Sequence, residues 1–348
     1  QRQMCIRDRE KLMRKVLVTG ASGFIAEHCI IELLKNNYSV KGSLRSMNRE
    51  QEVREAIKTE IDDANLEFCK LDLLKDDGWE DAMQDCEFLM HVASPFVIED
   101  PKDENELIKP AKEGTLRALN AAKKAGIKRV VITSSVAAIN SHMMSGKCDH
   151  NTWTDINSKY VTPYQRSKTI AEKAAWDFYD SQDDNKMEMA VVNPGGVMGP
   201  QLGNDLGGAS TQIVSQLISG KFPMIPALSF PFIDVRDVAI LHLRAMITPE
   251  ADGKRFIAAH SEPTWMFQVA EVLSKAGYGK IKLKKAPSLM LKLIGLFDNK
   301  TKSLIPMLDK YVPCDISQTV EILKWEPMPW EHAFIEHAKS IEAIEDKA

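Results

Sequence analysis

The sequence predicts an α/β fold with a doubly wound parallel sheet and a smaller, discontinuous C-terminal lobe. Short apolar runs alternate with helix-like stretches through the first half of the chain, which is typical of βαβ units. The first apolar run, residues 16–18, leads directly into a glycine turn and then into an amphipathic helix. The 348 residues suffice for one large or two modest domains with a proper core.

The predicted elements of the first half follow one another in a regular order. Apolar runs bounded by turn residues predict strands at residues 16–18, 38–44, 66–71, 88–92, 129–133 and 187–192. The stretches between them predict helices at residues 24–34, 49–58, 79–83, 106–125 and 162–179. Gly126 follows the longest of these helices and is a favourable C-terminal stop.

The pattern becomes less regular beyond the sixth predicted strand. Glycine, proline and asparagine are dense over residues 194–208, which predicts a long loop over the edge of the sheet. Residues 233–246 and 255–259 are expected to return to the main sheet, and residues 264–344 to form mostly short helices broken by prolines. The ligand site is expected in the cleft between the two parts of the chain.

These patterns predict a division of the chain into a nucleotide-binding Rossmann domain and a substrate-binding lobe. The charged, patternless residues 1–12 are expected to be a non-native leader and are excluded from the fold. The predicted ranges are 13–193 and 232–262 for the nucleotide-binding domain, and 194–231 and 263–348 for the lobe.

The composition excludes several classes of protein. The net charge of −4 gives no electrostatic reason to expect a nucleic acid or a membrane surface as partner. The six cysteines are scattered without a C-x-x-C pair, which favours reduced thiols in a cytoplasmic protein over a disulfide framework or a metal site. The longest apolar patch, residues 289–297, is too short to cross a bilayer and is expected to cap a pocket or to form a core helix.

The glycine turn after the first strand has the spacing G-x-x-G-x-x-A, formed by Gly20, Gly23 and Ala26. Gly20 allows a sharp turn, and Gly23 has no side chain to hold a pyrophosphate away from the backbone. The helix that follows offers free N–H groups and a positive dipole end to phosphates. The turn therefore predicts a dinucleotide site, with an ordinary strand-to-helix connection as the alternative.

A second motif, Tyr164 with Lys168, lies on a predicted helix, where residues four apart share a face. A nearby ammonium lowers the pKa of a phenol, which suits a tyrosine to act as a general acid toward a carbonyl oxygen. Ser135 ends the fifth predicted strand, at the edge where a serine can hydrogen-bond the same oxygen. The alternatives are a surface tyrosine beside a solvated lysine and a serine that caps a turn, a role that fits Ser134 better.

The end of the second predicted strand bears on the choice of cofactor. An acidic residue there would accept the ribose hydroxyl of NAD, but the chain has Arg45 and then Arg49, with no acid until Glu50. Arg45 can bind a phosphate through two hydrogen bonds, and Arg49 can add positive charge. We therefore expect NADP(H), with a solvated arginine pair as the alternative.

Taken together, the chain resembles an extended short-chain dehydrogenase/reductase. It is most similar to the branch of dihydroflavonol reductases, cinnamoyl-CoA reductases and NADPH-dependent methylglyoxal and aldehyde reductases. The resemblance covers about residues 13–263 and rests on these stretches: residues 18–26, 91–96, 133–135, 164–176, 193–194 with 199–200, and 233–239.

The resemblance implies a role for each matching residue. Ser135, Tyr164 and Lys168 match the catalytic serine, tyrosine and lysine, and Lys168 would also hold the nicotinamide ribose. His91 is expected to pack at a strand end and not to act in catalysis. The matching cofactor positions are Gly20, Gly23, Phe24 and Ile25 at the pyrophosphate, Asp72 and Leu73 at the adenine, Ala93 and Ser94 under the ribose and nicotinamide, and Pro194 and Val197 at the carboxamide. The matching substrate-pocket positions are Phe96, Val136 and Gly196.

The sequence also departs from the pattern of the wider family. The family often has an asparagine before the fifth strand, and this chain has Ala111-Lys112-Glu113-Gly114-Thr115 there, so an asparagine proton relay is not expected. Gly196 stands where related aldehyde reductases carry a bulkier residue, which predicts a roomier substrate pocket.

The expected function is reduction of a small-molecule aldehyde or ketone to an alcohol by an NADP(H)-dependent oxidoreductase, with Tyr164 as proton donor. Two alternatives remain: a nucleotide-sugar epimerase or dehydratase of the same fold, and a non-catalytic NADP-sensing protein. A monomer or a homodimer is expected, without a nucleic acid, membrane or metal partner.

Overall fold

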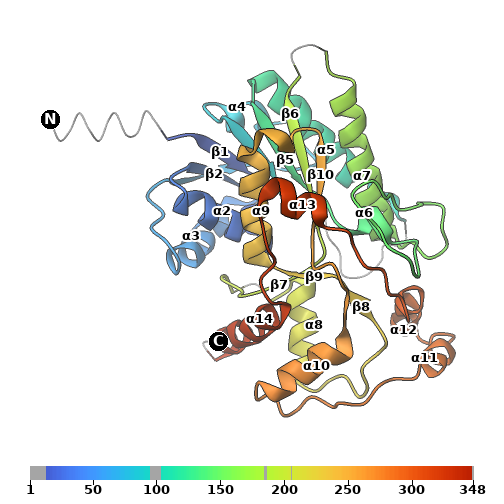
Figure 1. Ribbon diagram of the computed structural model, residues 1–348. Coiled ribbons are helices and arrows are strands. Elements are labelled where there is room, and N and C mark those ends of the chain that lie inside the picture. Colours follow the sequence, from blue (N-terminus) through green and yellow to red (C-terminus); the bar gives the residue numbers. More distant parts are fainter. Residues whose placement is uncertain (1–12, 95–102, 184–185, 205, 347–348) are drawn as a thin grey trace.

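The computed structural model describes residues 13–94, 103–183, 186–204 and 206–346 (Figure 1). Within these residues, the main sheet has seven parallel strands in the order β10-β6-β5-β4-β1-β2-β3. This order confirms the predicted doubly wound sheet. The strands are β1 (Lys15–Val18), β2 (Ser39–Leu44), β3 (Leu66–Lys70), β4 (Phe88–His91), β5 (Arg129–Thr133), β6 (Glu188–Pro194) and β10 (Lys254–Ala258).

Two layers of helices cover the sheet, as the almost continuous apolar character of its strands requires. Neighbouring strand residues point to opposite layers: on β1, Val16 and Val18 enter one core and Leu17 enters the other. The core around Val16 includes residues of α2 (Phe24–Lys35), α3 (Glu50–Lys58) and α9 (Val235–Ile247). The core around Leu17 includes residues of α4 (Trp79–Met83), α5 (Asn105–Ala125) and α7 (Pro163–Asp180).

A further group of helices lies beside the sheet, below it in Figure 1. Its core contains Val214 of α8 (Ala209–Ile218), Leu273 of α10 (Met266–Lys275) and Phe334 of α14 (Trp330–Glu345). The remaining elements are short: η1 (Met47–Arg49), α6 (Ala137–Asn140), β7 (Gly196–Met198), β8 (Ser229–Phe230), β9 (Phe232–Asp234), η2 (Pro249–Ala251), β11 (Thr264–Trp265), α11 (Ser288–Ile294), α12 (Asn299–Leu304), η3 (Ile305–Met307) and α13 (Ser317–Leu323).

Most predicted elements of the first half lie within one or two residues of the observed ones. The helix predicted to stop at Gly126 does end there, and Gly126 has a φ of 72°, the left-handed conformation that glycine favours. The region predicted as one long loop, residues 194–208, contains the strand β7, which pairs with β9. Because that partner lies far along the sequence, local turn residues gave no sign of it.

The prediction that residues 289–297 form a core helix is wrong. Within this patch α11 has no buried residue among its described side chains, and Leu289 and Leu296 are each 72% exposed. The same patch was alternatively expected to cap a pocket, and that alternative stays a prediction.

The division into two predicted units stays a prediction as well, and one segment crosses it. Leu323 of α13 and Trp325 pack into the core around Val16, although residues 263–348 are assigned to the lobe. The predicted leader, residues 1–12, lies outside the described residues. Across the part of the chain that the structure describes, no helix is both long and apolar enough to span a membrane.

Candidate active site

The candidate site lies at the carboxyl edge of the sheet, where β1, β4, β5 and β6 end. In a doubly wound sheet this edge faces the ligand crevice near the point where the strand order reverses. Here the order reverses between β1 and β4, which pair with each other. The glycine turn follows β1, Ala93 follows β4, and Ser135 follows β5, so three separate predictions converge on this edge.

The glycine turn closely approaches the residues after β4. Gly20 has a φ of 70°, and a Cβ on it would lie 3.0 Å from the Cβ of Ala93. Its N–H donates to Ser43 Oγ at 3.1 Å, which ties the turn to β2. Gly23 is the N-cap of α2 and makes no side-chain cap bond, so Phe24 and Ile25 open the helix with amides available to an anion.

The two arginines after β2 differ in their surroundings. Arg45 is exposed, directly after the strand whose Ser43 contacts the glycine turn. Arg49 is bound through two hydrogen bonds to Glu52, of 2.9 and 2.8 Å, and donates to Ser22 Oγ of the turn at 3.1 Å. Arg45 is thus the arginine available to a phosphate, whereas Arg49 braces the turn and shares its charge with a carboxylate.

The predicted adenine and nicotinamide positions lie at the ends of β3 and β4. Asp72 accepts a hydrogen bond from the Leu74 N–H at 3.0 Å, so its carboxylate also shapes the turn after β3. Leu73 packs close to α5, where a Cβ on Gly114 would lie 3.1 Å from the Cβ of Leu73. Ala93 donates its N–H to Thr19 Oγ1 at 3.0 Å, next to Ser94.

The predicted catalytic side chains come together. Tyr164 is the second residue of α7, which begins with a capping box between Thr162 and Gln165. The Ser135 hydroxyl is a hydrogen-bond partner of the Tyr164 phenol. Lys168 follows one helical turn later on α7 and is buried. The Tyr164 phenol therefore reaches Ser135 at the carboxyl edge of the sheet. The alternative of a surface tyrosine beside a solvated lysine does not fit this contact.

The protonation of this group differs from the sequence expectation. Burial raises the pKa of Tyr164 to about 12, and the hydrogen bond with Ser135 acts in the opposite direction. The expected lowering of the Tyr164 pKa by Lys168 is therefore not found in the protein alone, where burial dominates. Burial also lowers the pKa of Lys168 to about 8, while the charge of Glu172 raises it.

Ser135, and not Ser134, makes the turn-capping bond after β5. Ser135 Oγ accepts the N–H of Ala137 at 3.1 Å, a turn-capping bond that the sequence favoured for Ser134. Ser134 is buried, and its hydroxyl donates to Glu172 Oε2 at 2.5 Å.

His91 packs at the end of β4 as expected, with Nδ1 3.1 Å from Thr19 Oγ1. Burial lowers the pKa of His91 to about 4, with the charge of Lys168 adding to the effect, so its ring is neutral at pH 7.

The space beside Gly196, one of the predicted substrate-pocket positions, is not open. A Cβ on Gly196 would lie 2.6 Å from Cδ1 of Phe232, so the space beside this glycine is already filled by that ring. The roomier substrate pocket stays a prediction, since the glycine itself leaves no open space at its Cβ position. Val136 donates its N–H to the Pro194 carbonyl at 2.9 Å, and Val197 is buried in β7. Phe96 lies outside the described residues.

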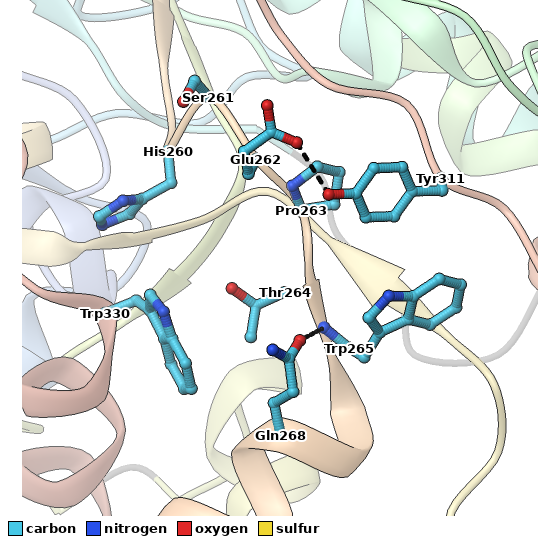
Figure 2. Close-up of a pocket in the computed structure, with 9 residues that line it drawn as sticks. All are labelled: His260, Ser261, Glu262, Pro263, Thr264, Trp265, Gln268, Tyr311 and Trp330. Atoms are coloured by element: carbon cyan, nitrogen blue, oxygen red, sulfur yellow. Dashed lines mark hydrogen bonds between the residues drawn. The ribbon is translucent and has the colours of Figure 1, made fainter.

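A cavity of about 480 Å³ is lined by other residues than these (Figure 2). In it the Tyr311 hydroxyl donates to Glu262 at 2.8 Å, and Gln268 accepts the N–H of Trp265 at 2.9 Å. None of its nine lining residues is a predicted site residue. Among the residues that the structure describes, no cluster of His, Cys, Asp and Glu could hold a metal ion.

The sequence left the buried Glu172 without a role. It is hydrogen-bonded to Ser134, beside the catalytic group, and forms an ion pair with Arg255. Its spacing of four residues from Lys168 was visible, but a glutamate within a charged helix gives no local sign of burial.

The sheet order and the glycine turn define a dinucleotide-binding protein of the Rossmann class. The sequence profile of the NAD dependent epimerase/dehydratase family matches residues 16–259. The chain therefore belongs to this family of extended short-chain dehydrogenases/reductases, in the branch of cinnamoyl-CoA and methylglyoxal reductases.

Two relatives and one solved structure illustrate the branch. Cinnamoyl-CoA reductase CAD2 of Medicago truncatula is 36% identical over 246 residues, 69% of this chain and 74% of the relative. NADPH-dependent methylglyoxal reductase GRE2 of Saccharomyces cerevisiae is 34% identical over 287 residues, 75% of this chain and 82% of the relative. The crystal structure of yeast methylglyoxal/isovaleraldehyde reductase Gre2 complexed with NADPH matches with a TM-score of 0.79 at 28% identity, covering 96% of this chain and 100% of that one.

Proposed function

We propose that this protein is an NADP(H)-dependent reductase of small aldehydes or ketones, with Tyr164 as the proton donor. The observation that carries the proposal is the Ser135–Tyr164 hydrogen bond at the carboxyl edge, with Lys168 one turn along the same helix. The names of relatives in the branch point the same way, since they include a cinnamoyl-CoA reductase and methylglyoxal reductases.

The residues present fit a phosphorylated dinucleotide. The turn needs glycine at both positions, because a Cβ on Gly20 would lie 3.0 Å from the Cβ of Ala93 and one on Gly23 would lie 3.2 Å from the Gly20 carbonyl oxygen. The first amides of α2 would hold the pyrophosphate, and the exposed Arg45 would bind the 2′-phosphate. The remaining cofactor positions in the proposal are Asp72, Leu73, Ala93, Ser94, Pro194 and Val197, with Arg49 bracing the turn.

The chain's own residues supply alignment and the proton. The cofactor, when bound, supplies the hydride for the carbonyl carbon. Tyr164 is protonated at neutral pH because its pKa is about 12, so its hydroxyl can donate to the oxygen as negative charge develops there. Ser135 would hold that oxygen, and the Lys168 ammonium would bind the ribose and stabilise the phenolate left behind.

The substrate class remains part of the proposal. Val136, Gly196 and Phe96 are proposed to line the substrate pocket, with Phe232 beside Gly196 limiting its size. A cytoplasmic location and a monomeric or homodimeric state are also proposed.

The experiment that tests this function follows NADPH oxidation with a panel of aldehydes, ketones, dihydroflavonols and acyl-CoA thioesters. Tyr164→Phe is expected to lower kcat by about 10²- to 10⁴-fold, because the general acid is lost, while NADPH affinity by fluorescence titration is retained. Tyr160→Phe is the matched control, since Tyr160 is exposed and precedes α7. Near wild-type kcat in Tyr164→Phe would refute the mechanism.

The same assay separates the alternatives. A nucleotide-sugar epimerase or dehydratase would convert its substrate without net NADPH oxidation. A sensing protein would bind NADPH and oxidise none of it with any carbonyl compound. Either result would overturn the proposed function.

A further inference from the structure

Glu172 carries a carboxylate that is buried inside the protein, next to the proposed catalytic group of Ser135, Tyr164 and Lys168. It lies on α7 one helical turn after Lys168, and its side chain has no exposed surface. Burying an ionised carboxylate is costly unless charges and hydrogen bonds compensate for it.

Among the described residues, four side chains donate hydrogen bonds to this carboxylate. Two of them lie at the carboxyl ends of β5 and β6, the third comes from near the amino end of β10, and the fourth comes from α7 itself. The donors are Ser134 Oγ at 2.5 Å, Asn193 Nδ2 at 2.7 Å, Arg255 Nε at 2.6 Å and Trp176 Nε1 at 3.3 Å. The carboxylate therefore joins β5, β6, β10 and α7 at one point.

Two of these donors also reach the backbone of the catalytic serine. Ser134 is its neighbour in the chain, and Asn193 Nδ2 donates to the Ser135 carbonyl at 3.2 Å as well. The position of Ser135 is thus tied to the same carboxylate as the helix that carries Tyr164 and Lys168.

Arg255 connects this carboxylate to the segment that precedes α7. Its Nη1 donates to the carbonyls of His150 and Thr152, at 2.8 Å each, and its guanidinium lies 3.7 Å from the centre of the Trp153 ring. The side chain is only 7% exposed. One buried arginine therefore holds both Glu172 and the chain that leads into the catalytic helix.

The charges around Lys168 come from several elements. Glu172 on α7 raises the lysine pKa against burial, and Arg255 on β10 contacts that same carboxylate. His91 on β4 faces the lysine with a neutral ring at pH 7. On the side of α5, Glu104 is paired with Arg166 at 2.5 Å.

We propose that Glu172 is a positioning residue of the reaction: its carboxylate, held by Arg255, fixes Ser135 relative to α7 and keeps a negative charge one turn from the Lys168 ammonium. This inference rests on the proposed function, because it concerns the same catalytic group. A buried ion pair is by itself weak support for stability, since apolar residues often replace such pairs without loss. Its place behind the catalytic group gives the carboxylate a further role.

The variant Glu172→Gln tests the proposal, because it keeps the shape of the side chain and removes its charge. Without that charge the pKa of Lys168 falls below about 8, by about one unit for a charge at this range. The alkaline limb of the kcat profile then moves to lower pH. The ratio of wild-type to variant kcat is expected to grow about fivefold from pH 6 to pH 8. A purely structural role of Glu172 would lower kcat by the same factor at both pH values.

Two further variants complete the design. Glu188→Gln is the matched control, because Glu188 pairs with an arginine at the opposite end of the same strands and is expected to leave the profile unchanged. The double variant Glu172→Gln/Arg255→Gln removes both charges, so it avoids an unpaired buried arginine and is expected to fold. Because losing the Arg255 cation opposes the loss of the carboxylate, its limb is expected to move in the same direction by less than in Glu172→Gln. A limb that stays at the wild-type pH in both Glu172 variants overturns the proposal, as does an equal shift in Glu188→Gln.

A second readout does not depend on activity. The ε-carbon resonance of Lys168 in ¹³C-lysine-labelled protein, assigned by its absence in Lys168→Met, reports the pKa of that lysine directly. A lower value in Glu172→Gln supports the proposal, and an unchanged value overturns it. If wild-type protein oxidises no NADPH with any carbonyl compound, the proposed function fails, while this titration still tests the inference.

Discussion

Two arginine–carboxylate pairs lie at opposite ends of β5 and β6: one joins residues of these strands at their amino ends, and the carboxylate of the other binds Ser134 and Asn193 at their carboxyl ends. The two pairs differ in which other groups they bind. At the amino end, Arg129 and Glu188 are paired residues of neighbouring strands, with Nε and Oε2 2.9 Å apart. Near the carboxyl end, Arg255 and Glu172 come from β10 and α7 and are 2.6 Å apart. The chemistry of the two pairs is the same, but their surroundings are not.

The amino-end arginine is directed at the end of a helix. Arg129 Nη1 donates to the carbonyls of Ala245, Met246 and Thr248, at 3.0, 3.2 and 2.5 Å, where α9 ends. These carbonyls lack partners within the helix, so the guanidinium satisfies them and complements the helix dipole. This pair serves the packing of α9 on the sheet.

The carboxyl-end pair is directed at the catalytic group instead. Its carboxylate is fully buried, whereas the Glu188 side chain is 34% exposed. In a doubly wound sheet the ligand crevice lies at the carboxyl edge, which is why the proposed positioning role falls to this pair. The comparison therefore assigns the Arg129–Glu188 pair to stability and the proposed positioning role to the Glu172–Arg255 pair.

The largest change in stability is expected from Arg255→Ala. It leaves the Glu172 carboxylate buried beside an empty volume and frees the carbonyls of His150 and Thr152. Removing one partner of a buried pair destabilises by about 3–5 kcal/mol, which urea unfolding would measure. Arg255→Lys is expected to recover only part of this, since an ammonium cannot reproduce the Nε and Nη1 contacts. A loss below about 1 kcal/mol in Arg255→Ala would mean that the pair is dispensable.

Arg129→Ala is expected to destabilise by about 2–3 kcal/mol, because the charged hydrogen bonds to the α9 carbonyls are lost. Leaving the Glu188 carboxylate without its arginine costs less free energy than doing so for Glu172, because water reaches Glu188. At temperatures well below unfolding, kcat and NADPH affinity should match those of the wild type. A fall in kcat without unfolding would contradict the assignment of this pair to stability alone.

The comparison also marks the limit of sequence-based prediction. Strands such as β1 and β4 were predictable because they are buried on both faces and therefore contain apolar runs, Val16–Val18 and Phe88–Met90. Tyr164 and Lys168 were predictable because helical spacing alone places them on one face. The Arg129–Glu188 pair follows from strand register, which a sequence does not state.

The features that the sequence missed depend on contacts between distant segments. Glu172 and Arg255 are 83 positions apart, and each is an ordinary charged residue in its local context. The Phe232 ring that fills the space beside Gly196 arrives through the pairing of β7 with β9. The exposed apolar side chains of α11 show the converse, since an apolar run predicts burial only if another surface covers it.

The smallest effect is expected from Glu188→Gln, and it sharpens the comparison most. The change removes one charge from a partly exposed pair, while Arg129 keeps its carbonyl partners on α9. The free energy of unfolding should therefore change by less than about 1 kcal/mol, as urea unfolding would show. A loss as large as that of Arg129→Ala would mean that the arginine depends on the carboxylate and not on the helix end. The Glu188 carboxylate would then be as necessary to its pair as the Glu172 carboxylate is to its own, and the proposed difference between the two pairs would be lost.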